Sequence, residues 1–210
     1  GGVLLKWLED FLTNRKMRVT LNEIKGIWTA VLSGVPRGSV LGPLLFLIYV
    51  NEISEIVNSS IKMFADDTKI WRTIKDDEDV KVLQNDLITL ENWSKKWLLK
   101  FNTDKCKLMH VGPVKDRKNC YFLYKDGQQS DLAETTVEKD LGVWISNDLK
   151  CSHQCNKAAS KAMSVLGIIK RNFNHLNLES FKILYNSYVH PHLEYCVQAR
   201  RPYLKKILNA

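Results

Sequence analysis

The sequence lacks any hydrophobic run long enough to cross a membrane. Its longest apolar stretch, from Val40 to Val50, is interrupted by Gly42 and Pro43, whereas a membrane-spanning helix needs roughly 20 consecutive apolar residues. The amino terminus, Gly-Gly-Val, has neither an initiator methionine nor a signal-peptide pattern. We therefore expect a chain that does not associate with a membrane and that is entered partway through a longer protein.

Cysteines are few and do not form a regular pattern. Five occur among 210 residues, an odd number at irregular spacing, which predicts reduced thiols in an intracellular protein. Cys151, His153 and Cys155 lie close together in the sequence but lack the paired spacing of a structural zinc site. We interpret them as the first residues of a helix.

The chain also lacks internal repeats and low-complexity tracts, and its composition is that of a folded protein. Apolar residues make up 45% and charged residues 26%. The chain has 31 Lys and Arg against 23 Asp and Glu, and residues 151–210 hold nine of the former and two of the latter. This basic end suggests an acidic polymer as partner. A helix bundle with a lysine-rich outer face is the alternative explanation.

Hydrophobic periodicity divides the chain into a mixed part and a helical part. In the mixed part we expect a helix over 4–12, strands over 18–21 and 27–31 joined by a turn over 22–26, and a mostly buried helix over 40–56 capped by Ser39. A hairpin over 61–71 and a long helix opened by the acidic residues 76–79 follow. Strands are predicted at 106–111, 120–124 and 141–145.

After Ser152 the pattern predicts helices only. One helix has an apolar face that includes Ala158 and Ala162, with Lys157, Lys161 and Lys170 around the rest of its surface. A second helix over 178–188 is expected to stop before Pro191. The fold class is therefore α+β, with a mixed segment over 1–150 and an all-helical segment over 151–210.

The adjacent aspartates Asp66 and Asp67 fall in the turn of the expected hairpin. Two neighbouring carboxylates repel each other unless a cation lies between them, and Mg²⁺ binds one or two carboxylates together with substrate phosphates. Two such ions can assist an in-line phosphoryl transfer. Solvated turn residues are the alternative explanation for such a pair.

The order of several motifs resembles that of reverse transcriptases from non-LTR (LINE-type, jockey-like) retrotransposons. Residues 33–46 (SGVPRGSVLGPLLF) resemble their B motif, and 64–67 (FADD) their C motif. Segments 90–97 and 101–107 resemble the D motif, 138–143 the E region, and 185–195, especially 191–196, a thumb signature. The resemblance extends over essentially the whole chain.

The resemblance implies a polymerase palm fragment, an antiparallel sheet with packed helices, followed by an all-helical thumb. Partial fingers and palm would occupy 1–150 and the thumb 151–210. The partners would be an RNA template/DNA primer duplex and a deoxynucleoside triphosphate, with the rest of a retrotransposon polyprotein upstream, and the cofactor Mg²⁺ in a two-metal site.

The resemblance also implies which residues would bind metal, nucleotide and duplex. Asp66 and Asp67 would be catalytic metal ligands, and Lys105 would protonate the departing pyrophosphate, unless it is a solvated charge at a strand edge. The loop formed by Pro36, Arg37, Gly38 and Ser39 would lie under the nucleotide and template base. Lys157, Lys161 and Lys170 would bind the duplex.

The sequence departs from the family pattern at two positions and in one motif. Arg37 stands where the family usually has Gln and cannot accept a hydrogen bond. Arg200 stands where the family has Trp, which changes the packing expected in the thumb. The A motif, which supplies a further catalytic aspartate, has no match between Gly1 and Ser33.

Three hypotheses follow from these motifs. The first is an RNA-directed DNA polymerase fragment, inactive by itself because the A motif is missing. The second is a degenerate relic that binds nucleic acid without chemistry. The third, an unrelated α+β protein with an accidental Asp-Asp pair, conflicts with the ordered motif series.

Overall fold

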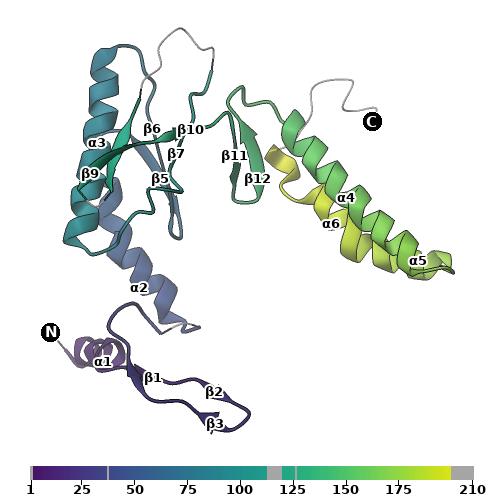
Figure 1. Cartoon of the computed structure of the whole chain (residues 1–210), viewed down its shortest axis with the longest axis horizontal. Coiled ribbons are helices and arrows are strands. Elements are labelled where there is room, and N and C mark those ends of the chain that lie inside the picture. Colours follow the sequence, from purple (N-terminus) through teal and green to yellow (C-terminus); the bar gives the residue numbers. More distant parts are fainter. Residues whose placement is uncertain (1, 37, 113–119, 126, 200–210) are drawn as a thin grey trace. The chain divides into compact units, whose positions relative to one another are not determined.

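A computed structural model describes residues 2–36, 38–112, 120–125 and 127–199 (Figure 1). The chain forms two compact units, Gly1–Phe101 and Asn102–Ala210. Each unit mixes helices with two-stranded sheets, so the expected α+β class is confirmed. The expected functional division near residue 150 lies inside the second unit and stays a prediction.

The first unit begins with helix α1 (Val3–Leu12) and two small strand pairs. Strand β1 (Lys16–Met17) pairs with β4 (Thr29–Ala30), and β2 (Thr20–Leu21) pairs with β3 (Ile24–Lys25), each antiparallel. The expected turn over 22–26 is tighter than the sequence indicates. Asn22 and Glu23 both have positive φ, 46° and 68°, as a type I′ two-residue hairpin turn requires.

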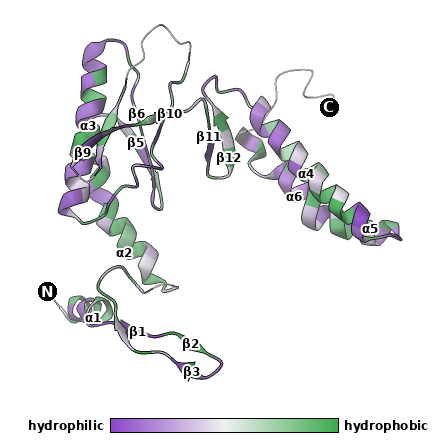
Figure 2. Cartoon of the chain, in the orientation of Figure 1, coloured by the Kyte–Doolittle hydropathy of each residue, from purple (hydrophilic) through white to green (hydrophobic). Residues whose placement is uncertain are grey.

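Helix α2 (Leu41–Val50) continues into a short 3-10 helix, η1 (Asn51–Ser54). It is hydrophobic along much of its length (Figure 2), which led us to expect a mostly buried helix. That expectation is wrong: Leu44, Leu47 and Ile48 are 52%, 57% and 65% exposed. Only part of the helix packs against the core, through Phe46 and Val50.

The core of the first unit joins α2 to a hairpin and a long helix. Strands β5 (Ser60–Phe64) and β6 (Asp67–Trp71) form the hairpin, and α3 (Asp77–Lys96) follows. The Asp76 side chain accepts the Asp79 N–H and caps α3, in agreement with the expected acidic helix start. The core residues are Val50, Ile53, Leu90 and Trp93, packed against the inner hairpin residues Ile61, Met63 and Ile70.

The second unit opens with three strand pairs. Strand β7 (Lys107–Leu108) pairs in parallel with β10 (Ala133–Glu134), and β8 (Phe122–Lys125) pairs antiparallel with β9 (Gln128–Asp131). Strands β11 (Val137–Asp140) and β12 (Val143–Ser146) form the third pair, an antiparallel hairpin. The sequence predicted β7, β8 and β12 but not their partners, which are short and polar.

Helices complete the second unit, with α4 (Ser152–Asn172) alongside a shorter helical segment (Figure 1). That segment runs through α5 (Leu178–Leu184), the π-helix η2 (Tyr185–Val189), α6 (His190–Glu194) and the 3-10 helix η3 (Val197–Ala199). The expected end of this helical segment before Pro191 is wrong, because the segment continues through the proline. The π turn, closed by the His190 N–H on the Tyr185 carbonyl, resets the hydrogen bonding just before the proline, which then occupies the first turn of α6.

Candidate functional site

The hairpin β5–β6 presents the two adjacent carboxylates at its tip. Phe64 pairs with Asp67 across the strands, so Ala65 and Asp66 form a two-residue turn. Both aspartates are exposed. Ala65 has a φ of 52°, a left-handed conformation that costs a non-glycine residue ~1–3 kcal/mol and that persists where the surrounding structure enforces it.

Burial alternates along both strands of this hairpin, as it must when one face packs against a core. Ile61, Met63, Thr68 and Ile70 are partly buried, whereas the opposite face is exposed. Asp67 belongs to the exposed face and Asp66 to the turn. The carboxylates are therefore accessible to a ligand in solution, while the hairpin behind them is fixed by core contacts.

Two carboxylates of α3 hold the base of the hairpin. Asp86, 1% exposed, accepts the backbone N–H of Asn58 at 2.9 Å and of Ser59 at 2.8 Å, just before β5. Asp79, two helical turns earlier, accepts from Arg72 Nε at 2.8 Å and from the Lys75 N–H at 3.0 Å, just after β6.

These bonds also affect the ionisation of Asp79. The Lys75 N–H and the Arg72 side chain together lower its pKa. Sequence reasoning missed both Asp79 and Asp86 as anchors, because a carboxylate on a helix is usually a solvated residue. The available signal was the position of Asp86 on the apolar face of the helix, three residues after Leu83 and four before Leu90.

The described residues of the loop over 33–39 make hydrogen bonds just before α2. Ser39 Oγ donates to the Pro36 carbonyl at 2.8 Å and accepts the Gly42 N–H at 3.1 Å. Ser39 therefore supplies a hydrogen bond to the first turn of α2 as expected, but from one residue before the N-cap position, which Val40 occupies. Gly38 has a φ of 77°, which favours glycine. Arg37 lies outside the described residues. Arg15, which the sequence did not single out, donates to the carbonyls of Ser33 and Gly34.

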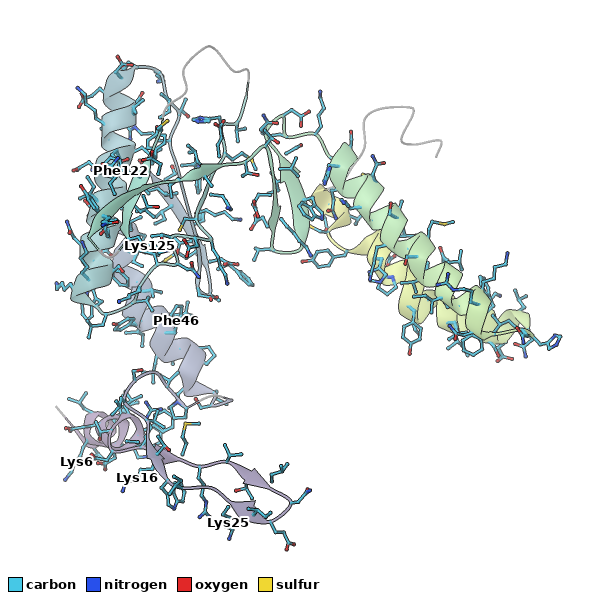
Figure 3. All side chains as sticks on the ribbon, viewed as in Figure 1. Lys6, Lys16, Lys25, Phe46, Phe122 and Lys125 are labelled. Carbon is cyan, nitrogen blue, oxygen red and sulfur yellow. The ribbon has the colours of Figure 1, made fainter. Side chains whose placement is uncertain are left out.

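Lys105 lies in the second unit, in a turn that precedes β7. Its side chain is exposed and its backbone N–H donates to the Asn102 carbonyl at 3.0 Å. The neighbouring Asp104 forms an ion pair with Lys125, at 2.7 Å. Lys125 lies at the end of β8 (Figure 3). Burial raises the pKa of the Cys106 thiol.

The three predicted thumb lysines are all exposed on α4 but do not share one side of it. With 3.6 residues per turn, Lys161 lies about 40° from Lys157 around the helix axis, and Lys170 about 140° away in the other direction. The buried stripe of Ala158, Ala162 and Ile169 separates Lys170 from Lys161. Arg171, exposed and about 40° from Lys157, completes a basic side with Lys157 and Lys161.

The hairpin β11–β12 is attached to the helical segments of the second unit by contacts at Trp144 and at its turn. Gln154 of α4, 6% exposed, accepts the Trp144 N–H at 2.9 Å, and Lys157 Nζ lies 5.7 Å from the Trp144 ring centroid. At the turn, Tyr195 donates to the Leu141 carbonyl at 2.5 Å. Its ring covers Gly142, where an added Cβ would lie 3.1 Å from Tyr195 Cε1.

Asp148 accepts hydrogen bonds within the loop that connects β12 to α4. Its carboxylate accepts the Ser146 hydroxyl at 2.6 Å and the Lys150 N–H at 3.0 Å. These bonds stabilise the charged form and lower the pKa of Asp148 to about 2.

No group of three His, Cys, Asp or Glu side chains could hold a metal ion within the described residues. Asp66 and Asp67 fit Mg²⁺ in kind, since it takes one or two carboxylates and completes its shell with water and substrate phosphates. All five cysteines are thiols. In the same described ranges, every helix is too short or too polar to cross a bilayer.

Along the chain, the hairpin with its paired carboxylates comes first and the helices of the second unit follow. This is the order of the motifs that the sequence resemblance led us to expect. The chain belongs to the reverse transcriptase (RNA-dependent DNA polymerase) family, which matches residues 3–169. Among its relatives is the RNA-directed DNA polymerase from mobile element jockey of Drosophila funebris, 26% identical over 97% of this chain. The expected resemblance to non-LTR, jockey-like reverse transcriptases is confirmed.

Two further relatives come from Drosophila melanogaster. The probable RNA-directed DNA polymerase from transposon BS is 32% identical over 50% of this chain, and that from transposon X-element 28% over 47%. The match covers 24% of the D. funebris protein and 12% of each of these two, so the chain spans a quarter or less of these relatives. No solved structure is significantly similar to it.

Proposed function

We propose that this chain carries the nucleotidyl-transfer hairpin and the duplex-binding helices of an RNA-directed DNA polymerase. The observation that carries the proposal is the exposed Asp66–Asp67 pair at the tip of a hairpin whose base is held by Asp79 and Asp86. Rigid placement of carboxylates at an accessible turn is what a metal-assisted phosphoryl transfer requires. The partners would be an RNA template/DNA primer duplex and a deoxynucleoside triphosphate.

In this proposal Asp66 and Asp67 would hold Mg²⁺ in a two-metal site, and the ions would supply positive charge for the transfer of a phosphoryl group. The primer 3′-hydroxyl would release its proton to water as its oxygen forms a bond to the α-phosphorus of the triphosphate. The bond between the α-phosphorus and the oxygen that bridges it to the β-phosphorus would break, and pyrophosphate would leave. Lys105 would give its proton to the leaving pyrophosphate. The turn formed by Pro36, Gly38 and Ser39, together with Arg37, would lie under the nucleotide.

The second part of the proposal concerns duplex binding and the activity of the isolated chain. Lys157, Lys161 and Arg171, which share one side of α4, would contact phosphates of the duplex, whereas Lys170 lies on another side of the helix. Two carboxylates without a third acidic ligand would hold the ions weakly, so we expect the chain by itself to synthesise little or no DNA. Template-dependent primer extension by the purified chain with Mg²⁺ would contradict this.

Metal binding tests the hairpin assignment directly. Mn²⁺ can replace Mg²⁺ on oxygen ligands and is observed by electron paramagnetic resonance. We expect the chain to bind Mn²⁺ and the double variant Asp66→Asn/Asp67→Asn to bind at least tenfold more weakly. The matched control, Asp76→Asn/Asp77→Asn, removes the same charge from the start of α3 and should bind like the parent chain. Equal binding by the two double variants would contradict the assignment.

A non-catalytic nucleic-acid-binding relic is the alternative. The basic side of α4 favours it, because phosphate binding there needs no metal. In that case the chain would bind a duplex but show no Mn²⁺ affinity that depends on Asp66 and Asp67. The same two measurements therefore separate the enzyme fragment from the relic.

A further inference from the structure

Strands β1 to β4 form a two-stranded ribbon over residues 16–30, which we call the N-terminal ribbon (Figure 1). All of its residues are exposed. A two-stranded ribbon by itself is only marginally stable in water, because no second layer covers its apolar side chains. The N-terminal ribbon is therefore a surface that gains stability when a partner covers it.

The side chains of the ribbon differ in chemistry between its two sides. Facing residues of antiparallel strands share a side, and successive residues of a strand alternate between sides. All three charged residues of the strands, Lys16, Arg18 and Lys25, therefore lie on one side, the basic side. Arg18 Cζ lies 4.5 Å from the centroid of the Trp28 ring on the same side. The other side, which we call the apolar side, carries five apolar residues that are 58–91% exposed: Met17, Val19, Leu21, Ile24 and Ile27.

A β-bulge in the middle of the ribbon keeps this division of the side chains. Residues 18–19 on one strand face residues 26–28 on the other, so the second strand has one extra residue. The Gly26 N–H donates to the Val19 carbonyl at 2.8 Å, and Gly26 and Ile27 both lie opposite Val19. A Cβ on Gly26 would lie 3.3 Å from the Val19 carbonyl oxygen, so glycine suits this close approach. The bulge thus leaves Ile27 beside Val19 on the apolar side.

From this arrangement we infer that the apolar side binds a second copy of the same chain, with two N-terminal ribbons stacked face to face about a two-fold axis. Two stacked ribbons about 10 Å apart form a four-stranded sandwich that buries both apolar sides. No like charges meet in this contact, since the charged residues of the strands lie on the basic side, which stays in solvent. The inference goes beyond the proposed function and does not depend on Asp66 or Asp67.

The size of the apolar side matches what a stable dimer needs. A standard interface buries about 800 Å² per partner, about 60% of it apolar, so each copy must supply roughly 500 Å² of apolar surface. Five apolar side chains supply about this area at roughly 100 Å² each. A two-fold contact uses the same patch on both copies. The second copy therefore offers a surface of the required area, with the same length and the same right-handed twist.

Sedimentation velocity of the full 210-residue chain tests the inference. We expect a monomer–dimer equilibrium between about 1 and 100 µM, because interfaces of this size have micromolar or tighter affinities. Val19→Thr/Ile27→Thr keeps β-branched side chains, which strands favour, but removes apolar surface from the middle of the contact. It should weaken the dimer at least tenfold. The control Lys16→Thr/Lys25→Thr changes the same strands on the basic side and should dimerise at least as tightly as the parent chain.

Photocrosslinking identifies the contact surface without a loss of apolar area. A benzophenone amino acid in place of Leu21 should crosslink to residues 16–30 of a second copy, and crosslinks confined to other parts of that copy would overturn the inference. A dimer that Val19→Thr/Ile27→Thr leaves unchanged would also overturn it. So would a parent chain that stays monomeric up to about 100 µM, and the apolar side would then belong to a different occupant, such as another segment of a longer protein.

Two further measurements on the same samples separate dimerisation from folding and from the proposed function. The circular dichroism spectrum of Val19→Thr/Ile27→Thr should match that of the parent chain, so that its weaker dimer reports on the contact. Mn²⁺ binding that depends on Asp66 and Asp67 should also be the same in both chains. If the dimer is absent and this Mn²⁺ binding is present, the proposed function stands and only the inference about the ribbon is wrong.

Discussion

Asp86 shows what a single residue contributes to the candidate site. A buried carboxylate is costly unless it is fully hydrogen-bonded, and Asp86 accepts two backbone N–H groups and the Asn58 side-chain amide at 3.3 Å. Those donors belong to the two residues that lead into β5. The carboxylate therefore fixes where the hairpin starts, and through the hairpin it fixes where Asp66 and Asp67 lie.

Replacement of Asp86 by Asn should destabilise the first unit by about 2–3 kcal/mol, because the amide group presents a donor to a buried backbone N–H. Urea unfolding measures this. The control Glu78→Gln removes an exposed partner of Lys81 on the same helix and should cost less than ~1 kcal/mol. Mn²⁺ affinity at Asp66 and Asp67 should fall in Asp86→Asn even at temperatures where the variant is folded. A loss of stability with unchanged Mn²⁺ affinity would limit Asp86 to a structural role.

At the scale of elements, sequence analysis found the helices and strands that local periodicity determines. It missed the helices and strands that depend on tertiary contacts. The β5–β6 hairpin and the starts of α3 and α4 follow from alternating or helical patterns and from caps such as Asp76. Strands β9 and β10 carry no apolar alternation, so only their pairing partners define them. The continuation of the helix through Pro191 depends on a π turn that no local propensity indicates.

The same limit applies to the candidate site. The carboxylate pair and the hydrogen bond between Ser39 and the first turn of α2 are local features, and sequence reasoning found both. Asp86 and Arg15 act on backbone groups 28 and 19 residues away, so only the folded chain brings them to their partners. Lys170 was grouped with Lys157 because both lie outside the apolar face of the helix, but the surface outside that face is wide enough to hold them on different sides.

The contact between Tyr195 and the β11–β12 turn joins the end of α6 to the hairpin. Substitutions on the two sides of the contact measure how much it stabilises the fold. Leu141 and Gly142 both have positive φ, 45° and 86°. Tyr195→Phe should cost about 0.5–1.5 kcal/mol through the lost hydrogen bond to Leu141. Gly142→Ala should cost ~1 kcal/mol or more, because it adds a Cβ at an unfavourable φ and against the Tyr195 ring.

A double-mutant cycle distinguishes coupling from two independent effects. In the Gly142→Ala background, Tyr195→Ala should cost less than in the parent chain, because it removes the ring that the new Cβ meets. Urea unfolding of the four chains gives the coupling energy. Additive costs would show that the turn and the helical segment are stabilised separately, in contradiction to the close approach of ring and glycine.

At the scale of the whole molecule, the described lysine and arginine residues among the last 60 residues do not share one surface. Of the nine Lys and Arg there, Arg200, Arg201, Lys205 and Lys206 lie outside the described residues. Of those described, Lys157, Lys161 and Arg171 share one side of α4 and Lys170 lies on another. Electrostatic binding of a duplex needs charges that reach the same phosphates, so the distribution matters more than the net charge.

This distribution predicts that equal changes of charge on α4 have unequal effects. Lys157→Glu/Lys161→Glu should weaken duplex binding strongly and reduce the salt slope by about 2, since two phosphate contacts are lost. Lys170→Glu/Lys182→Glu makes the same change of net charge in the same unit but away from the basic side of α4, and we expect a much smaller effect. Fluorescence anisotropy of a labelled duplex between 50 and 200 mM salt measures both. Equal losses of affinity would mean that duplex binding depends on the overall charge of the second unit. The assignment of one side of α4 as the duplex-binding surface would then be wrong.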